Sequence, residues 1–357
     1  MRNRPARLAP VCDPGVAMQR FLRFTSVIVA LGLAGFAARA DDRDQDERDP
    51  CESLTPAAAG GPVPHDDDRL VVRYLGTTNY ELAYRNQVIL LDTYYDRGPR
   101  NRPIGLIPDQ VTRADVIFLG HGHFDHMSDA SSIASRLGIR AIGGPPTYEK
   151  LLTQGLSDGQ AVRITGTGGE LFRFRGFTVE PVLAHHSVLS GAVIGAFTTA
   201  IQTELGKPTP EQAAAEAVVL ARGTFDPRVL TIGTIAYLFT FDSGFRLIWL
   251  DSAGPITDQL RALMARIGHT DVAIVAYVGH YVQETQIPVT MALVSLFNPR
   301  FYLPAHHDEI RDIFTDLGLE PLFLTMRDET NIKPISLLYR GAVCFNVHSG
   351  KLFHSDH

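Results

Sequence analysis

The fold of this 357-residue chain is decided by one short stretch, His121-Gly122-His123-Phe124-Asp125-His126. Three histidines and a carboxylate lie within six residues, directly after the apolar run at 116–119. Gly120 and Gly122 let the backbone turn tightly there. Such groups would be costly to bury without partners, and zinc-like ions bind imidazole nitrogens and carboxylate oxygens. The stretch therefore predicts a metal site at the end of a strand.

Strand and helix patterns surround this stretch on both sides. Apolar runs at 70–75, 88–92 and 116–119 predict core strands, and residues 236–241 and 245–250 predict a hairpin. In the last third of the chain, helices alternate with strands, as in a layered α/β domain. We expect helices near 128–137, 255–267, 289–297 and 308–317, and further strands at 177–183, 271–277, 301–303 and 322–324.

The N-terminus has the pattern of a secretory signal peptide over residues 1–40. Arg20 and Arg23 precede an apolar run at 24–37, and Ala38-Arg39-Ala40 has the small-x-small form of a cleavage site. About 14 apolar residues are fewer than the roughly 20 that a membrane span needs. We therefore expect export to the periplasm or the medium, with no stable membrane span after cleavage.

Residues 41–68 are rich in Asp, Arg, Pro and Gly, which predicts a flexible acidic leader. Cys12 falls in the segment to be removed, leaving Cys51 and Cys344 as an even pair in an oxidising compartment. Two interpretations stay open. The two cysteines form a disulfide that joins the ends of the mature chain, or Cys344 is a buried small hydrophobic residue.

An interruption of the pattern at about 188–230 predicts a helical insertion. It contains an apolar segment at 188–201 and a capping box at Thr209-Pro210-Glu211-Gln212. The insertion is either a lid over the metal site or a helix pair packed on the scaffold. The formal charge of the chain is only −6 and no block of Lys and Arg recurs, which argues against a nucleic-acid partner.

The pattern H-x-H-x-D-H at 121–126 resembles the signature of the metallo-β-lactamase superfamily. The resemblance covers about residue 70 to the C-terminus and is strongest to the branch of ascorbate-6-phosphate lactonases and N-acyl-phosphatidylethanolamine phospholipase D. It implies a four-layer αββα sandwich that forms a single catalytic domain over residues 69–357, including the helical insertion.

The resemblance also implies three further metal ligands, each at a strand end. His186 is preferred to its neighbour His185, because the branch places its ligand at the second of these positions. Asp251 is the expected bridging acid, although Leu250-Asp251-Ser252 stands where the family has Gly-Asp-Thr. The alternative for Asp251 is a turn-forming role. His306 follows Pro304-Ala305, as the family pattern requires.

Carried over to this sequence, the resemblance implies two divalent ions. Zinc is the first expectation, with manganese or iron as alternatives. One ion would be held by His121, His123 and His186, the other by Asp125, His126 and His306, with Asp251 between them.

Four other positions are singled out near the expected centre. Asp125 is also expected to act in catalysis, and His280 to stabilise an oxyanion or protonate a leaving group. Asp92 would support the metal loop without binding metal, and residues 77–80 would form a turn at the site. His307 and Asp308 are expected to begin a helix, with Asp308 as its cap.

These residues predict a hydrolase that cleaves an ester-type bond, either a lactone or a phosphodiester, with a metal-bound hydroxide. The expected substrate is a small or lipid-like molecule. One alternative is an amide hydrolase of the β-lactamase type. The other is a non-catalytic protein of the same fold that binds a metal or ligand.

Overall fold

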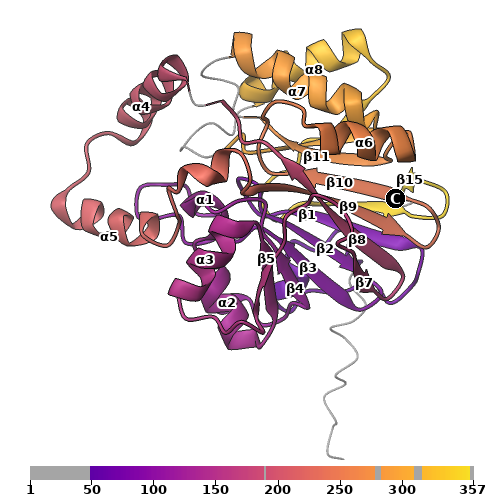
Figure 1. Ribbon diagram of the computed structural model, residues 1–357, viewed down its shortest axis with the longest axis horizontal. Helices are drawn as coiled ribbons and strands as arrows, with labels where there is room; N and C mark the ends of the chain where they lie inside the picture. Colours follow the sequence, from indigo (N-terminus) through magenta and orange to yellow (C-terminus); the bar gives the residue numbers. More distant parts are fainter. Residues whose placement is uncertain (1–48, 189, 278–282, 309–315, 354–357) are drawn as a thin grey trace, which may run out of the picture. The chain divides into compact units, whose positions relative to one another are not determined.

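Two β-sheets lie face to face in the computed structural model, which describes residues 49–188, 190–277, 283–308 and 316–353 (Figure 1). All of these residues belong to the compact unit formed by residues 43–357. The predicted signal peptide lies outside the described residues. In the part of the chain that the structure describes, no helix combines the length and apolar character needed to cross a membrane.

The first sheet contains the first and the last strand of the chain that the structure describes. Its strands, in spatial order, are β15 (Lys351–Leu352), β14 (Ala342–Asn346), β1 (Arg69–Tyr74), β2 (Tyr80–Tyr84), β3 (Gln87–Leu91), β4 (Val116–Phe118), β5 (Arg140–Gly143) and β6 (Ala161–Arg163). The pairings are antiparallel from β15 to β3 and parallel from β3 to β6.

The second sheet comes from the second half of the chain. Its spatial order is β13 (Lys333–Pro334), β12 (Phe301–Ala305), β11 (Val272–Ala276), β10 (Arg246–Leu250), β9 (Thr234–Phe241), β8 (Phe177–Ala184) and β7 (Phe172–Phe174). Strands β10 to β13 are parallel, and β7 to β10 are antiparallel. The predicted hairpin joins β9 to β10, and Gly244 at its turn has φ +88°.

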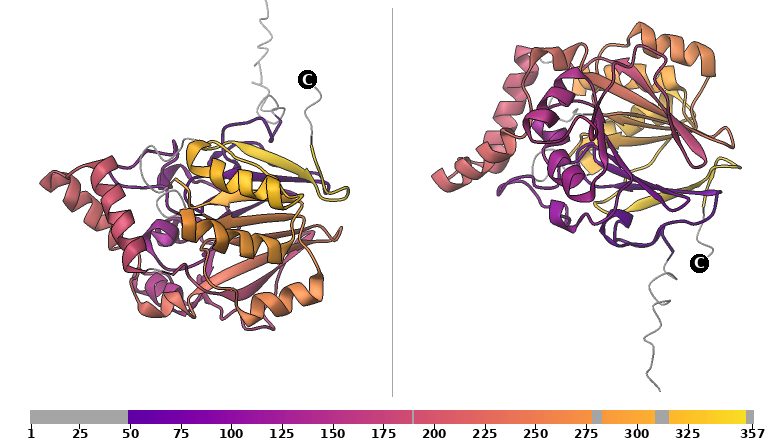
Figure 2. Two further views of the ribbon diagram at one scale, coloured as in Figure 1. Left: turned by 90° about the horizontal axis from the view of Figure 1, so that it is seen from above. Right: turned by 60° about the horizontal axis from the view of Figure 1, so that its bottom comes forward.

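Side-chain alternation along the strands produces three separate cores. In β1, Leu70 and Val72 face the core between the sheets, whereas Val71 faces the helices outside the first sheet. In β10, Trp249 faces the inner core and Ile248 the helices outside the second sheet. Because successive strand side chains point to opposite faces, both sheets must be covered on both sides. The four-layer αββα prediction is confirmed (Figure 2).

Helices cover the two outer faces. Helices α2 (Ala130–Leu137) and α3 (Pro145–Thr153) pack on the first sheet, after the short helix α1 (Phe124–Met127). Helices α6 (Asp258–Ile267), α7 (Gln283–Phe297) and α8 (Asp316–Glu329) pack on the second. Short 3-10 helices η1 (Ala57–Ala59), η2 (Pro108–Gln110) and η3 (Pro227–Leu230) lie in connecting segments.

The strand expected at 322–324 is wrong, because these residues belong to α8. Leu319, Leu322, Phe323 and Met326 are all buried in the core over the second sheet. This spacing of three and four residues is that of one helical face, and the short apolar run alone could not distinguish it from a buried strand. Of the helix expected at 308–317, residues 309–315 lie outside the described part.

The flexible leader expected at 41–68 is wrong for residues 49–68, which pack on the first sheet. The Glu81 carboxylate accepts hydrogen bonds from the Ala57 and Ala58 amides at 2.8 and 2.6 Å. Arg73 donates to the carbonyls of Pro50 and Ser53, the former at 2.9 Å. Arg73 and Glu81 also form a buried ion pair with each other at 3.3 Å. Together with Ala57, Ala58 and Val63, which are buried in the outer core, these polar contacts anchor the segment. Residues 41–48 lie outside the described part.

A disulfide joins Cys51 to Cys344 across a sequence separation of 293 residues. It attaches the leader to β14, and Cys344 is also buried in the outer core of the first sheet. Both interpretations of Cys344 therefore hold at once: it is a cross-link and a core residue.

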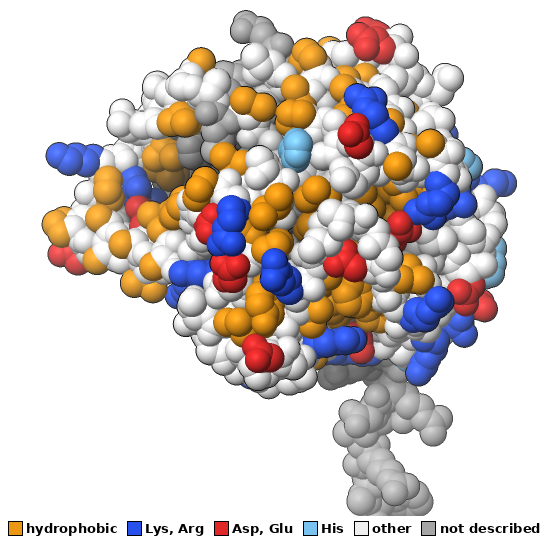
Figure 3. Space-filling model, in the orientation of Figure 1, with side chains coloured by type: hydrophobic (Ala, Val, Ile, Leu, Met, Phe, Trp, Pro, Cys, Tyr) orange, Lys and Arg blue, Asp and Glu red, His pale blue; other side chains and the backbone are white. Residues whose placement is uncertain are grey.

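The insertion consists of helices α4 (Gly191–Leu205) and α5 (Pro210–Leu220), at the left of Figure 1. Thr209 and Gln212 form the predicted capping box. Val219 is buried and Glu216 pairs with Arg100, which attaches α5 to the domain. Ile194, Val218 and Leu220 are exposed, and hydrophobic side chains gather on this side of the molecule (Figure 3).

Candidate metal centre

The seven predicted donors meet because of strand direction. The motif at 121–126 follows β4 of the first sheet, while His186, Asp251 and His306 follow β8, β10 and β12 of the second. Strands β8 and β10 are each antiparallel to β9, and β10, β11 and β12 are parallel. All three strands therefore end at the same edge of the second sheet. A hydrogen bond from the Ile235 amide to the Gly120 carbonyl, 2.8 Å long, joins the two sheets there.

Three histidines form the first group of donors: His121, His123 and His186. The Nε2 atom of His121 lies 3.0 Å from Nδ1 of His123, and the His186 ring packs edge-on against both rings. His186 Nδ1 lies 2.8 Å from the Ser187 carbonyl oxygen. Since a carbonyl only accepts hydrogen bonds, Nδ1 carries the proton and Nε2 is left available to a metal.

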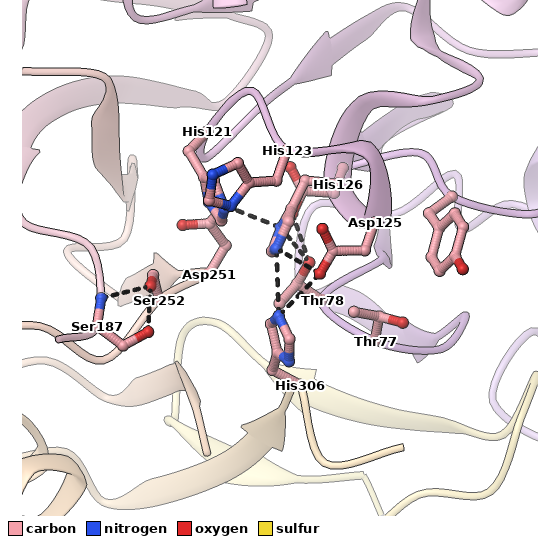
Figure 4. Close-up of polar contacts among 12 residues, drawn as sticks. Thr77, Thr78, His121, His123, Asp125, His126, Ser187, Asp251, Ser252 and His306 are labelled. Carbon is pink, nitrogen blue, oxygen red and sulfur yellow. Dashed lines mark hydrogen bonds and ion pairs between the residues drawn. The ribbon is translucent and has the colours of Figure 1, made fainter. Parts of the chain in front are cut away.

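The second group contains Asp125, His126 and His306. The Nε2 atoms of His126 and His306 are 3.3 Å apart, and Oδ2 of Asp125 lies 3.1 Å from Nε2 of His306 (Figure 4). Nitrogens bound tetrahedrally to one zinc ion at 2.0–2.1 Å would lie about 3.4 Å apart. The observed spacing of these two imidazoles therefore suits a shared ion.

Asp251 lies between the two groups. Its Oδ2 atom is 2.6 Å from Nδ1 of His121 and 3.1 Å from Nδ1 of His126. Its other oxygen, Oδ1, is buried and has no hydrogen-bond partner within the described residues. A buried carboxylate oxygen without a partner is costly, and a cation would satisfy it. The donor set thus fits divalent metal ions, with Asp251 able to serve both groups.

Asp92 and Thr78 hold the motif in place through contacts with Gly120 and His126. One oxygen of Asp92 accepts the Gly120 amide at 2.9 Å, and the other lies 2.7 Å from Nδ1 of His126. The Thr78 hydroxyl contacts both Asp92 and His126. The structure thus gives Asp92 the supporting position that was predicted. The expected turn at 77–80 is also present, closed by a hydrogen bond from the Asn79 amide to the Gly76 carbonyl.

Gly120 is required for a different reason from the tight turn inferred from sequence. A Cβ atom added to it would lie 1.9 Å from the carboxyl carbon of Asp251. Only glycine lets the bridging acid approach the motif loop so closely.

The three imidazoles of the first group have the protonation state that metal binding needs. Burial lowers the pKa of His121 and His123 to about 3 and that of His186 to about 4. These rings are therefore neutral at pH 7, as ligation requires. Burial also acts to lower the pKa of His126, but Asp125, Asp92 and Asp251 together raise it well above its ordinary value. Three carboxylates around one ring mark a place for further positive charge.

His306 is held by a network that was not foreseen. Its amide donates to the Thr77 carbonyl at 2.6 Å, and the Thr77 amide donates to Asp308 at 2.7 Å. Arg97 forms a buried ion pair with Asp308 at 3.1 Å, and the Tyr339 hydroxyl donates to the same carboxylate at 2.6 Å.

The helix that His307 and Asp308 are expected to begin would run through residues 309–315, which lie outside the described part of the chain. Both lie in irregular backbone and are buried; Asp308 takes part in the network above, and His307 stacks on Tyr74. No local sequence signal marked Arg97 or Tyr339, because each acts through a partner that is distant in the chain.

Two further predictions concern single histidines. The structure brings His186, and not His185, to the other donors, while the His185 carbonyl lies against Gly254. His280 lies outside the described residues.

The C-terminal end of the insertion borders the motif. The Thr224 amide donates to the Gly122 carbonyl at 2.7 Å, and Gly223 lies against the backbone of Phe124. The ring of Phe225 is 6.0 Å from that of His123 and is 68% exposed. An apolar residue of the insertion thus stands next to the first group of donors.

Comparison with known proteins agrees with this geometry. A family profile described as "Beta-lactamase superfamily domain" matches residues 87–206, which include the motif. A metal-dependent hydrolase of Cupriavidus metallidurans is 23% identical over 255 residues, covering 71% of this chain and 77% of that protein. One from Carboxydothermus hydrogenoformans is 23% identical over 247 residues, covering 69% and 88%.

The fold is shared with a solved structure, that of Igni18, described as a novel metallo hydrolase from Ignicoccus hospitalis. The TM-score is 0.53 at 15% identity, over 78% of this chain and 98% of that one. The more specific branch inferred from sequence stays a prediction. Taken together, the profile, the relatives and the shared fold support the metallo-β-lactamase superfamily and indicate a metal-dependent hydrolase of that fold.

Proposed function

We propose that this protein is an exported enzyme that cleaves an ester-type bond, a lactone or a phosphodiester, at a centre of two divalent metal ions. The observation that carries the proposal is the pairing of two donor groups through Asp251. The first group is all histidine and the second includes a carboxylate. Two ions at such a centre supply a hydroxide nucleophile near neutral pH and polarise the oxygen of the bond to be cleaved.

The protein side chains would position this chemistry. Asp125 belongs to the second group of donors, where its carboxylate would accept a hydrogen bond from the attacking water. Burial acts to raise the pKa of Asp125, but His126 and His306 hold it well below its ordinary value, so it stays ionised. Asp92 fixes the orientation of His126, and Ser187 and Ser252, 3.0 Å apart between hydroxyl oxygens, tie the His186 loop to the Asp251 loop. We retain His280 as the proposed donor to the leaving group.

The insertion is proposed to cover part of the substrate. Its attachment beside Gly122 and the exposed ring of Phe225 support this role. A partly apolar or lipid-like substrate would contact this ring.

Export is supported by two independent observations. The sequence of residues 1–40 has the signal-peptide pattern, and disulfides such as Cys51–Cys344 persist mainly in oxidising compartments.

The test combines metal analysis with a substrate screen on the mature protein. We expect about two equivalents of zinc, manganese or iron, and hydrolysis of a lactone, a nitrophenyl ester or bis(4-nitrophenyl) phosphate that stops with a chelator and returns with metal. Hydrolysis that survives metal removal would overturn the metal mechanism. One equivalent of metal with full activity would overturn the two-metal centre. Cleavage of nitrocefin alone would indicate an amide hydrolase instead.

A further inference from the structure

Phe225 lies in a segment that connects the motif loop to the His186 loop. Just before it, the Thr224 amide donates to the Gly122 carbonyl at 2.7 Å. Further along, the Leu230 carbonyl accepts a hydrogen bond from the His186 amide at 3.2 Å. The segment is therefore attached to both of the loops that supply the first group of donors, and Phe225 stands between the two attachments.

Close packing on both sides of Phe225 fixes the backbone of this segment. Gly223 lies against the backbone of Phe124, where a Cβ atom would have no room. On the other side, Asp226 caps the short helix η3 with its side chain, and Val229 within η3 is fully buried. Movement of the segment would break these contacts, so it forms a fixed wall beside the first group.

The side chain on this wall is an exposed aromatic ring. Phe225 is 68% exposed, and its ring centre lies 6.0 Å from that of His123 and 6.4 Å from that of Phe124. An ion bound to His123 would lie about 3 Å from the centre of that imidazole, so the Phe225 ring lies within about 9 Å of it in any arrangement. A ring attached directly to a metal-bound group can reach that far.

The surroundings of Phe225 favour a flat, aromatic partner. The Phe124 ring is tilted by 44° to the Phe225 ring, and Tyr94 packs edge-on against Phe124. An exposed ring is stabilised when a ligand covers it, and a second aromatic ring adds to the gain from buried area by offset stacking or edge-to-face contact. An aliphatic chain would gain only from the buried area.

We infer that Phe225 determines substrate specificity by binding an aromatic ring that the substrate carries next to the bond to be cleaved. The inference rests on the proposed function, because the wall adjoins the proposed reaction centre. It narrows the substrate class from partly apolar molecules to esters, lactones or phosphodiesters that bear an aryl group.

The test measures binding of three hydroxamates to the zinc-loaded protein by calorimetry. Benzohydroxamate and cyclohexanecarbohydroxamate carry the same zinc-binding group on an aromatic and an aliphatic ring, and acetohydroxamate has no ring. Phe225→Leu keeps an apolar side chain but removes the aromatic one. We expect this change to lower the affinity for benzohydroxamate, relative to cyclohexanecarbohydroxamate, by about two- to tenfold.

Two further variants locate the effect. Phe225→Ala removes the wall and should weaken both ring-bearing hydroxamates about tenfold, with acetohydroxamate unchanged because the metal centre is intact. The matched control is Phe174→Leu, the same change at a residue paired with Phe177 at the start of β8, whereas His186 follows the end of that strand. It should leave all three affinities unchanged.

Three results would overturn the inference. The first is the same ratio of benzohydroxamate to cyclohexanecarbohydroxamate affinity in the wild type and in Phe225→Leu, which would indicate an aliphatic substrate group. The second is an equal loss of acetohydroxamate binding in Phe225→Ala, which would mean that Phe225 acts on the metal centre. The third is a comparable change of the ratio in Phe174→Leu.

The outcome is separable from that of the proposed function, because binding is measured without turnover. A preference that depends on Phe225, in a protein that hydrolyses no ester-type substrate, would overturn the proposed function and leave the aromatic site. Chelator-sensitive hydrolysis without such a preference would overturn the aromatic site alone. A protein that binds none of the three hydroxamates would lack the centre on which both proposals rest, and both would be overturned.

Discussion

Four of the seven candidate donors come from one loop and the short helix α1, whereas the other three come from the ends of β8, β10 and β12. We call His121, His123, Asp125 and His126 the motif side, and His186, Asp251 and His306 the strand-end side. The backbone of the motif side is held within its own segment, because the amides of His126 and Met127 both donate to the His123 carbonyl. Its side chains also have distant partners, since Asp92 lies 2.7 Å from Nδ1 of His126 and Asp251 lies 2.6 Å from Nδ1 of His121.

The strand-end side depends on partners that are far away in the chain. His306 has φ +59°, a left-handed conformation that is unfavourable for a residue with a side chain. Its backbone is held by Thr77, which is held in turn by Asp308 across a sequence separation of 231. The comparison teaches that a compact motif can fix the backbone of its own donors, whereas the backbone of the strand-end donor His306 depends on contacts with distant segments.

The largest effect is expected on the motif side, from His121→Ala. His121 belongs to the first donor group and also contacts Asp251, so its loss removes support for both groups. Loss of a residue that only orients a ligand costs roughly 10–100-fold, and a direct donor should cost more than about 100-fold in activity. Elemental analysis should show reduced metal content. A variant with full metal content and activity would exclude His121 as a ligand.

The next largest effect tests the strand-end side through Arg97→Met. This change leaves Asp308 buried without its cation, which should destabilise the fold by roughly 3–5 kcal/mol. Through Thr77 and His306 it should also weaken metal binding roughly 10–100-fold in a chelator competition. Arg300→Met is the control, because the exposed Arg300 side chain lies 3.7 Å from Asp271, and it should cost no more than about 1 kcal/mol. Unchanged metal affinity in Arg97→Met would show that the remote supports do not matter to the site.

A variant remote from both sides should separate stability from activity. Replacing Cys51 and Cys344 with serine removes a link that closes a loop of 293 residues, and should cost roughly 2–5 kcal/mol of unfolding free energy. The rate of the folded enzyme below its unfolding temperature should not change. A loss of activity in folded protein would mean that the leader contributes to the site.

The smallest effect concerns Asp129, which lies three residues after His126 and forms an ion pair with Arg222 at 3.2 Å. Burial raises the pKa of Asp129 to about 6 from an ordinary 3.8. Because the folded-state pKa is the higher one, this group stabilises the fold at low pH and loses that contribution as the pH rises from about 4 to 6. The difference between these two pKa values corresponds to about 3 kcal/mol in the free energy of unfolding.

Asp129→Asn should remove this pH dependence. Unfolding of wild type and variant is compared at intervals between pH 4 and pH 8. The stability of the wild type should fall relative to the variant as the pH rises through that window. Parallel pH profiles would contradict the assignment.

Much of the architecture could be predicted from periodicity. The strands β1, β3, β4 and β8 and the β9–β10 hairpin lie where apolar runs predicted them. The prediction of a strand at 322–324 was wrong because a three-residue apolar run is compatible with either a helix or a strand. The burial of one face of α8 shows that these residues are helical. The prediction of a flexible leader was wrong for residues 49–68 because the residues that hold this segment, Arg73 and Glu81, lie outside it in the sequence.

By itself, the sequence determined the motif side of the centre, because its donors lie within one loop and their spacing is local. It also indicated the three strand-end donors, through their positions after apolar strands and through resemblance to a family. Only the tertiary structure decided how Asp251 lies between the two groups and how Arg97 and Asp308 hold His306. Both arrangements depend on contacts between segments that are far apart in the chain. Side-chain packing in the folded protein sets such contacts, and local sequence propensity does not predict them.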